Sequence, residues 1–149
     1  MTEVERNADI RKVADQLDRA VERRDLNTVL GFFTENCEVT LFGIKLTGKD
    51  ALGRAFQSLY EKLENVRFEP ITIMTEESTL FEEFRLHATS PGGEAVSIEA
   101  AEVLNFDGNL VVGMRLYLDR LQLAGIIAEG ILERKLLEAI ERKSREGIE

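Results

Sequence analysis

Two alternating apolar segments between Val96 and Asp119 place the strongest limit on the possible fold. They flank the tight-turn sequence Asp107-Gly108-Asn109 and therefore predict a pair of long antiparallel strands. Because side chains alternate between the two faces of a strand, six positions of the first segment share one face. They are Val96, Ile98, Ala100, Glu102, Leu104 and Phe106. Five of them are apolar, so Glu102 is a carboxylate on a face that otherwise predicts a core.

The second segment continues the pattern on one face. Its predicted inward set is Leu110, Val112, Met114, Leu116 and Leu118, and Arg115, Tyr117 and Asp119 lie opposite. A buried carboxylate loses its hydration, so it either finds a partner or keeps its proton. Glu102 is therefore the main functional candidate, as a general acid or base inside a dry pocket. The structural alternative is a carboxylate hydrogen-bonded to a Tyr, an Arg or ordered water.

The composition excludes several classes of partner and site. The 149 residues suit one domain with a core, and the formal net charge of −9 argues against nucleic acid and anionic membranes as partners. The single cysteine, Cys37, and the single histidine, His87, exclude an intramolecular disulfide, a cysteine cage and a histidine-rich metal site. No apolar run approaches the length of a membrane span, and the charged N-terminus is no secretory signal. The expected location is the cytoplasm.

Helical periodicity dominates the first third of the chain. Thr2 and Glu5 fit a capping box, and an apolar stripe at helical spacing follows as far as Arg24. Its members are Ile10, Val13, Ala14, Leu17, Ala20 and Val21. We predict a short second helix that carries Phe33, and a third helix that begins after the turn at 47–50.

Strand signals fill most of the remaining domain. Residues 38–42 alternate as a short strand, and 44–46 can return as its hairpin partner. Residues 66–74 and 80–89 then precede the two long segments, and Pro70 indicates an edge strand or a bulge. Helices come first and an antiparallel meander follows, which predicts an α+β fold.

The end of the chain predicts helix again. Asp119 and Gln122 can cap a helix, and the helical signal is firm at 131–144. We expect a domain at 1–125 and a C-terminal helical extension at 126–149. An amphipathic helix has to cover its apolar side, so we expect the extension to pack on the domain or on a second subunit of a homodimer.

Four short segments suggest a family. They are DLNTVLGFF at 25–33, LTGKDAL at 46–52, FDGNL at 106–110 and YLD at 117–119. Their order and spacing resemble the landmarks of the NTF2-like superfamily, which includes SnoaL-like polyketide cyclases, ketosteroid isomerases and limonene epoxide hydrolases. The resemblance covers about residues 8–125. It implies a cone in which a curved antiparallel sheet wraps around the N-terminal helices and encloses an apolar pocket that needs no cofactor.

Most catalytic positions of these enzymes are replaced here. Set against the ketosteroid isomerases, the general base falls on Leu41 and the first-helix Tyr on Leu17, whereas the protonated acid of the oxyanion hole falls on Glu102. Set against the epoxide hydrolases, Arg85-Leu86-His87 has His in place of Asp, and Leu116 replaces an acid. A SnoaL-like cyclase needs one inward acid as a proton shuttle, so the resemblance leaves that class open.

The implied cone predicts a set of residues around Glu102 that line the pocket. They are Leu17, Phe33, Leu41, Phe56, Tyr60, Phe84, Leu104, Met114 and Leu116. Tyr60 could also donate a hydrogen bond to Glu102, although a core tyrosine is the alternative. Glu82 could join Glu102 in the pocket, but exposure close to the strand end is the expectation. Local hydrophobicity places Arg85 and His87 on the outer face, whereas alignment with the epoxide hydrolases would turn them toward the pocket, and both placements stay open with the outer face favoured.

Three functions stay open at this point. The chain could be a cofactor-independent isomerase, cyclase or lyase in which Glu102 transfers a proton on an apolar carbonyl compound. It could equally be a non-catalytic binder of a small apolar molecule, since Leu17, Leu41 and Leu116 replace polar catalytic groups. It could also be an association module that uses the outer sheet face and residues 126–149.

Overall fold

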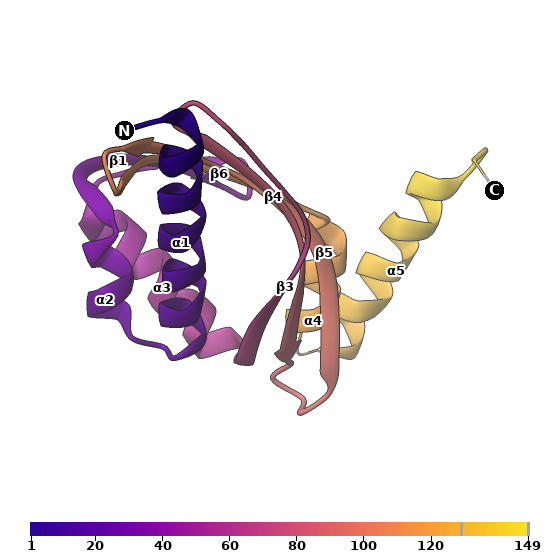
Figure 1. Cartoon of the computed structure of the whole chain (residues 1–149). Helices are drawn as coiled ribbons and strands as arrows, with labels where there is room; N and C mark the ends of the chain where they lie inside the picture. Colours follow the sequence, from indigo (N-terminus) through magenta and orange to yellow (C-terminus); the bar gives the residue numbers. More distant parts are fainter. Residues whose placement is uncertain (129, 149) are drawn as a thin grey trace.

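In the computed structural model, which describes residues 1–128 and 130–148, three helices lie against the concave side of a curved sheet (Figure 1). The helices are α1 (Glu3–Glu22), α2 (Leu26–Gly31), α3 (Lys49–Lys62), α4 (Arg120–Ile127) and α5 (Ile131–Arg145). The strands are β1 (Phe33–Leu41), β2 (Ile44–Thr47), β3 (Glu64–Glu76), β4 (Thr79–Thr89), β5 (Ala95–Asp107) and β6 (Leu110–Leu118). This arrangement confirms the α+β prediction.

The six strands of the described residues form one sheet in the order β2-β1-β6-β5-β4-β3. The predicted antiparallel meander from β3 to β6 is present, and β1 and β2 form the predicted hairpin. The sheet is mixed rather than wholly antiparallel, because β1 pairs with β6 in parallel. Strands from the two ends of the domain therefore meet at the centre of the sheet.

The apolar stripe of α1 faces the sheet as its spacing predicted. Its six members are all buried, and Thr2 and Glu5 form the capping box at the N-terminus of the helix. Arg24 follows α1 and donates hydrogen bonds to the carbonyl oxygens of Tyr60 and Leu63 at the end of α3. The last turn of α3 therefore has its free carbonyl groups satisfied by an arginine from another element.

Two local predictions have different outcomes. Pro70 lies in β3, which is the edge strand, and the β3–β4 register shifts between Pro70 and Thr72, so both predicted features are found. The prediction that Phe33 belongs to the second helix is wrong, because α2 ends at Gly31 and Phe33 begins β1. Phe33 pairs with Val111 of β6, and this long-range pairing overrides the local helical signal.

The inward set predicted for β6 is partly wrong. Val111 is fully buried, whereas Leu110 is 41% exposed and Val112 is half-buried. The register of β5 against β6 shifts between Asn105 and Phe106, and such a bulge reverses which residues face the core. Beyond the shift, the predicted alternation holds from residue 114 to 118.

The C-terminal helices differ in how they pack. The Asp119 carboxylate accepts hydrogen bonds from the backbone N–H groups of Leu121 and Gln122, so it is the predicted N-cap of α4. In contrast, α5 projects away from the sheet (Figure 1), and Leu132 and Leu136 are 82% and 61% exposed. The predicted boundary at residue 125 falls within α4. None of the described helices is both long enough and apolar enough to cross a membrane.

Candidate functional site

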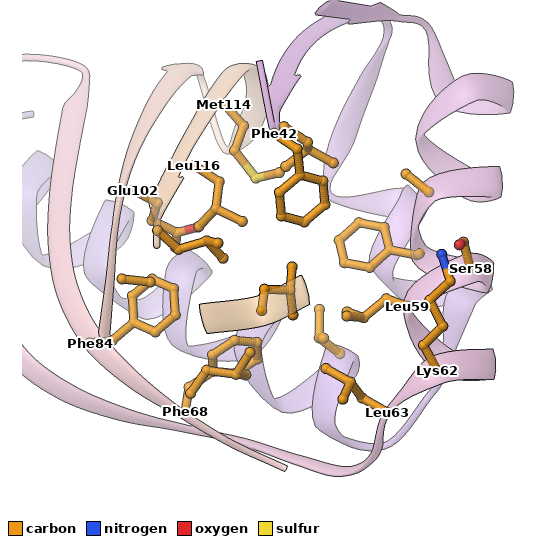
Figure 2. A pocket seen from close by; sticks show the side chains of 18 of the residues that line it. Phe42, Ser58, Leu59, Lys62, Leu63, Phe68, Phe84, Glu102, Met114 and Leu116 are labelled. Carbon is orange, nitrogen blue, oxygen red and sulfur yellow. The ribbon is translucent and has the colours of Figure 1, made fainter. Parts of the chain in front are cut away.

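The cone encloses a cavity of about 350 Å3 between the sheet, α1, α3 and α4. This volume lies within the usual range for sites that bind small molecules. Figure 2 shows apolar side chains pointing into the cavity from several elements. Those that surround it include Leu17, Leu41, Phe42, Phe56, Leu59, Phe68, Phe84, Met114, Leu116, Leu123 and Ile127. The space is therefore suited to an apolar molecule.

Three carboxyl groups converge beside this apolar space. Asp18, Glu82 and Glu102 each place a carboxylate oxygen within 4.8 Å of the others. Glu82 and Glu102 are direct neighbours across β4 and β5, and Asp18 reaches them from α1. Asp18 and Glu102 line the cavity, whereas Glu82 is 3% exposed and lies behind them.

Burial and mutual repulsion raise the pKa of each of these groups. Loss of hydration, followed by the charges of Glu82 and Glu102, raises the pKa of Asp18 to about 9. Loss of hydration and the charge of Glu82 raise the pKa of Glu102 to about 8. Burial and the charge of Asp15 raise the pKa of Glu82 as well. The three groups therefore titrate as a coupled set that loses its protons one after another, Glu102 before Asp18.

No basic side chain within residues 1–128 and 130–148 forms an ion pair with any of the three carboxyl groups. Arg19 is the nearby cation that lowers the pKa of Asp18 and Glu82, but its guanidinium pairs with Asp15 and Glu22. Carboxyl groups that lack a cationic partner in an apolar site are stable only if they share protons or receive a ligand.

The carboxyl groups could in principle hold a hard divalent cation. Three carboxylate oxygens at such separations are ligands that Mg2+ or Ca2+ accepts. Binding would first have to displace the protons, and the raised pKa values of Asp18 and Glu102 oppose this. The arrangement therefore fits proton transfer better than it fits a cation.

Most of the residues predicted for the pocket lie at the cavity. Glu102 faces it, together with Leu17, Leu41, Phe56, Phe84, Met114 and Leu116. Two of the predicted residues, Phe33 and Leu104, are only 1% and 0% exposed and belong to the solid core. Neither residue lines the cavity, because both are packed in the buried core cluster. Ligand binding by the others stays a prediction.

Tyr60 also lies away from the cavity. Its hydroxyl donates a hydrogen bond to the backbone carbonyl of Val21 at 3.0 Å, and the Arg24 guanidinium lies 4.7 Å from the centre of its ring. The predicted hydrogen bond to Glu102 is therefore wrong, and the alternative of a core tyrosine is the one found. Tyr60 ties α3 to α1 and so supports the wall of the cavity from behind.

The remaining candidates divide between the two faces of the sheet. The expectation that Glu82 is exposed near its strand end is wrong, because α1 covers this part of β4. Arg85 and His87 lie on the outer face, as local hydrophobicity predicted. The Arg85 guanidinium pairs with Glu99, and the His87 ring lies 2.6 Å from the Glu69 carboxylate.

Sequence reasoning missed Asp18, whereas the placement of Phe42 in the core and pocket wall was expected from the group of phenylalanines at 32, 33, 42 and 56. Asp18 lies four residues after Ala14 and three before Val21, and both are members of the buried stripe, so helical spacing alone could have placed Asp18 at the edge of the core. Phe42 occupies the β1–β2 turn with φ of 53°, a conformation that bulky residues rarely adopt. Figure 2 shows its ring directed into the cavity.

Comparisons with known proteins give a family and a fold. A family model described as a SnoaL-like domain matches residues 13–114.

Solved structures with the same fold are also found. An NTF2-like protein of unknown function from Burkholderia pseudomallei aligns with TM-score 0.74 and 16% identity, over 81% of this chain and 98% of that chain. A proposed polyketide cyclase from Xanthomonas campestris aligns with TM-score 0.74 and 12% identity, over 83% and 99%. A Catenulispora acidiphila protein of ketosteroid isomerase-like fold, in complex with trimethylamine, aligns with TM-score 0.70 and 13% identity, over 77% and 91%. No curated protein matches the sequence.

Proposed function

Because the chain belongs to the SnoaL-like domain family and has the NTF2-like fold, we propose that it binds a small apolar molecule in the cone and exchanges a proton with it. The observation that carries this proposal is the meeting of Asp18 and Glu102 at an otherwise apolar cavity. Titratable groups whose pKa values are shifted by burial and by each other are typical of acid-base catalysis.

The chemistry follows from two neighbouring carboxyl groups that do not ionise together. A neutral carboxyl group can donate a hydrogen bond to the carbonyl oxygen of a bound ketone, while an ionised neighbour accepts the proton from the adjacent carbon. The carbon–hydrogen bond breaks, an oxygen–hydrogen bond forms on the carboxylate, and the electron pair moves into the enolate. Where a carbon–carbon double bond is conjugated with the enolate, return of the proton to its far carbon completes an isomerisation. Attack by the enolate carbon on a second carbonyl carbon, with return of the proton to the alkoxide that forms, completes a cyclisation.

The roles divide by position. We assign proton transfer to Glu102, because it faces the cavity from β5 and its pKa of about 8 makes it the first of the two cavity-lining acids to lose its proton. We assign the hydrogen bond to the carbonyl oxygen to Asp18, whose pKa of about 9 keeps it protonated at neutral pH. The polyketide cyclase proposed for the Xanthomonas campestris neighbour is consistent with a carbonyl substrate. The proton transfer proposed here uses only the carboxyl groups of Asp18 and Glu102.

The test measures proton exchange directly and needs no knowledge of the natural substrate. Cyclohexanone and larger alicyclic ketones are incubated in D2O at neutral pH, and deuterium incorporation next to the carbonyl is followed by NMR. We expect the wild-type chain to accelerate exchange over buffer and Glu102→Gln to lose about a hundredfold or more of that acceleration. Undiminished exchange by the variant would remove the proposed role of Glu102.

A matched control tests whether the loss of exchange is specific to carboxyl groups at the cavity. Glu83 lies next to Glu82 but is exposed on the outer face, where its carboxylate accepts a hydrogen bond from Thr72. Glu83→Gln keeps an oxygen acceptor at that position, so it should leave exchange unchanged. Asp18→Asn should reduce exchange while the fold, followed by circular dichroism, remains intact.

A non-catalytic binder is the alternative, and the leucines at 17, 41 and 116 favour it because no further polar group faces the cavity from these positions. Native mass spectrometry of freshly purified protein would then show a retained apolar molecule and the exchange assay would be negative. Association is compatible with either function. The exposed apolar side of α5 supports a homodimer, and sedimentation velocity measures it.

A further inference from the structure

Two cationic side chains, Lys62 and Arg120, line the same cavity as Asp18 and Glu102. Lys62 comes from the last turn of α3, and Arg120 is the first residue of α4. Neither forms an ion pair or a side-chain hydrogen bond with another described residue. Both side chains are exposed and therefore solvated, and they are the two cations among the described residues that line the cavity.

Helix stability explains the position of one cation but not of the other. Lys62 lies in the last turn of α3, where a cation is favoured by the helix dipole, although Arg24 already donates to the carbonyl oxygens of Tyr60 and Leu63 there. A cation in the first turn of a helix opposes the helix dipole, so Arg120 is unfavourable for α4 by that measure. The position of Arg120 is therefore not explained by its own helix.

The two cations are exposed at the mouth of the cavity, and Lys62 lies on the side opposite Glu102. Figure 2 shows Lys62 and Ser58 across the cavity from Glu102. Ser58 and Lys62 are four residues apart on α3, so they share a face of the helix. Arg120 lies over the β1–β2 turn, where its Nη1 atom would be 3.3 Å from a Cβ built on Gly43, next to Phe42.

We propose that the cavity takes an amphiphile with one anionic group, which Lys62 and Arg120 hold at the mouth while the apolar body extends toward Glu102. The proposal rests on the proposed binding function and adds the class and orientation of the ligand. An anion at the inner wall would meet three carboxyl groups without a cationic partner, which is costly in an apolar site. The cations at the mouth and the carboxyl groups at the inner wall therefore allow a bound amphiphile only one orientation in the cavity.

The orientation also narrows the substrate for the proposed proton transfer. The reacting carbonyl must lie at the end of the molecule remote from its anionic group, because the carboxyl groups that would act on it are across the cavity from Lys62. The class is therefore an apolar keto acid, or a related anion with a distal ketone. A carboxylate next to the ketone would not reach both ends of the site.

The experiment compares three ligands with the same alkyl chain and different heads: decanoate, decanol and decyltrimethylammonium. Affinities are measured by calorimetry at neutral pH, below the concentrations at which these compounds form micelles. We expect decanoate to bind tightest and decyltrimethylammonium weakest. Lys62→Met and Arg120→Met should each weaken decanoate about fivefold and leave decanol unchanged, as expected for hydrogen-bonded but solvated charges.

Arg54→Met is the matched control, because Arg54 is an exposed cation of α3 that does not line the cavity. It should leave all three affinities unchanged. Lys62→Glu should reverse the preference and favour the ammonium compound over decanoate. Added salt should weaken decanoate and not decanol.

The outcomes separate this inference from the binding function. Equal affinity for decanoate and decanol, or no effect of the Lys62 and Arg120 substitutions, would show that these two cations do not bind the anionic group. The cavity would still be a binding site. Tightest binding of decyltrimethylammonium overturns it in favour of recognition by the carboxyl groups. Failure of all three ligands to bind overturns the binding function together with the inference. Glu102→Gln should lose proton exchange and keep the preference for decanoate.

Discussion

The substitution Glu102→Gln should make the protein more stable at neutral pH even though it removes the proposed proton-transfer group. Glutamine has nearly the shape of glutamate but no charge to be desolvated. The pKa of Glu102 rises from 4.5 to about 8 on folding, so the unfolded chain ionises at a pH where the native protein still binds the proton. The stabilising effect of protonation is complete below pH 4.5 and disappears as the pH rises through 8.

The magnitude follows from these two pKa values. At pH 7 the ionisation of Glu102 in the unfolded chain lowers the free energy of unfolding by roughly 3 kcal/mol, and at pH 5 by about 1 kcal/mol. Wild-type stability should therefore fall by roughly 3 kcal/mol between pH 5 and pH 8 from this group alone. Asp18 and Glu82 act in the same direction, since burial raises their pKa values too.

Urea denaturation at pH 5, 6, 7 and 8 measures this effect. The wild-type free energy of unfolding should decline across the series, and the decline should be smaller by roughly 3 kcal/mol for Glu102→Gln, which keeps the contributions of Asp18 and Glu82, so the two curves separate as the pH rises. Glu83→Gln, on the outer face, should follow the wild type. Parallel curves for wild type and Glu102→Gln, or a wild-type protein that is more stable at pH 8 than at pH 5, would refute the reasoning.

Three further predictions use other parts of the structure. Tyr60→Phe removes the hydrogen bond to the Val21 carbonyl and should cost about 1 kcal/mol in urea denaturation, without changing decanoate affinity, because Tyr60 does not line the cavity. Phe42→Gly should relieve about 1 kcal/mol of backbone strain but weaken ligand binding by removing part of the wall; calorimetry and denaturation report the two effects separately. Deletion of 130–149 should leave the melting temperature of the monomer nearly unchanged, since α5 packs on α4 and not on the core, and a change in sedimentation coefficient beyond the lost mass would show that α5 joins subunits.

Local periodicity accounts for the part of the site that was predicted. The inward aim of Glu102 follows from the alternation of β5, which has no irregularity between residues 95 and 105. The same reasoning fails at Leu110 and Val112, because the bulge beside Asn105 changes the phase and no residue pattern there announces it. The alternation of residues along a strand therefore predicts which side chains face the core only where the pairing of the strands is regular.

Tertiary contacts account for what was missed. Glu82 is near a strand end, and its burial depends on α1 lying across β4, a contact between segments far apart in the sequence. Asp18 was overlooked although it borders the apolar stripe of α1, because a charge at the edge of a helix face usually reaches water. The three acids meet only because the folded sheet brings β4 and β5 against α1. No single segment of the sequence shows that contact.

The parallel pairing of β1 with β6 has a consequence for synthesis of the protein. The first strand leaves the ribosome long before the last, so β1 waits with one edge unpaired until β6 arrives to fill the place between β1 and β5. Pairings of such distant segments form slowly. A nascent chain thus acquires its internal cavity as one of the final events of folding, and a chain released before β6 is complete has no enclosed cone.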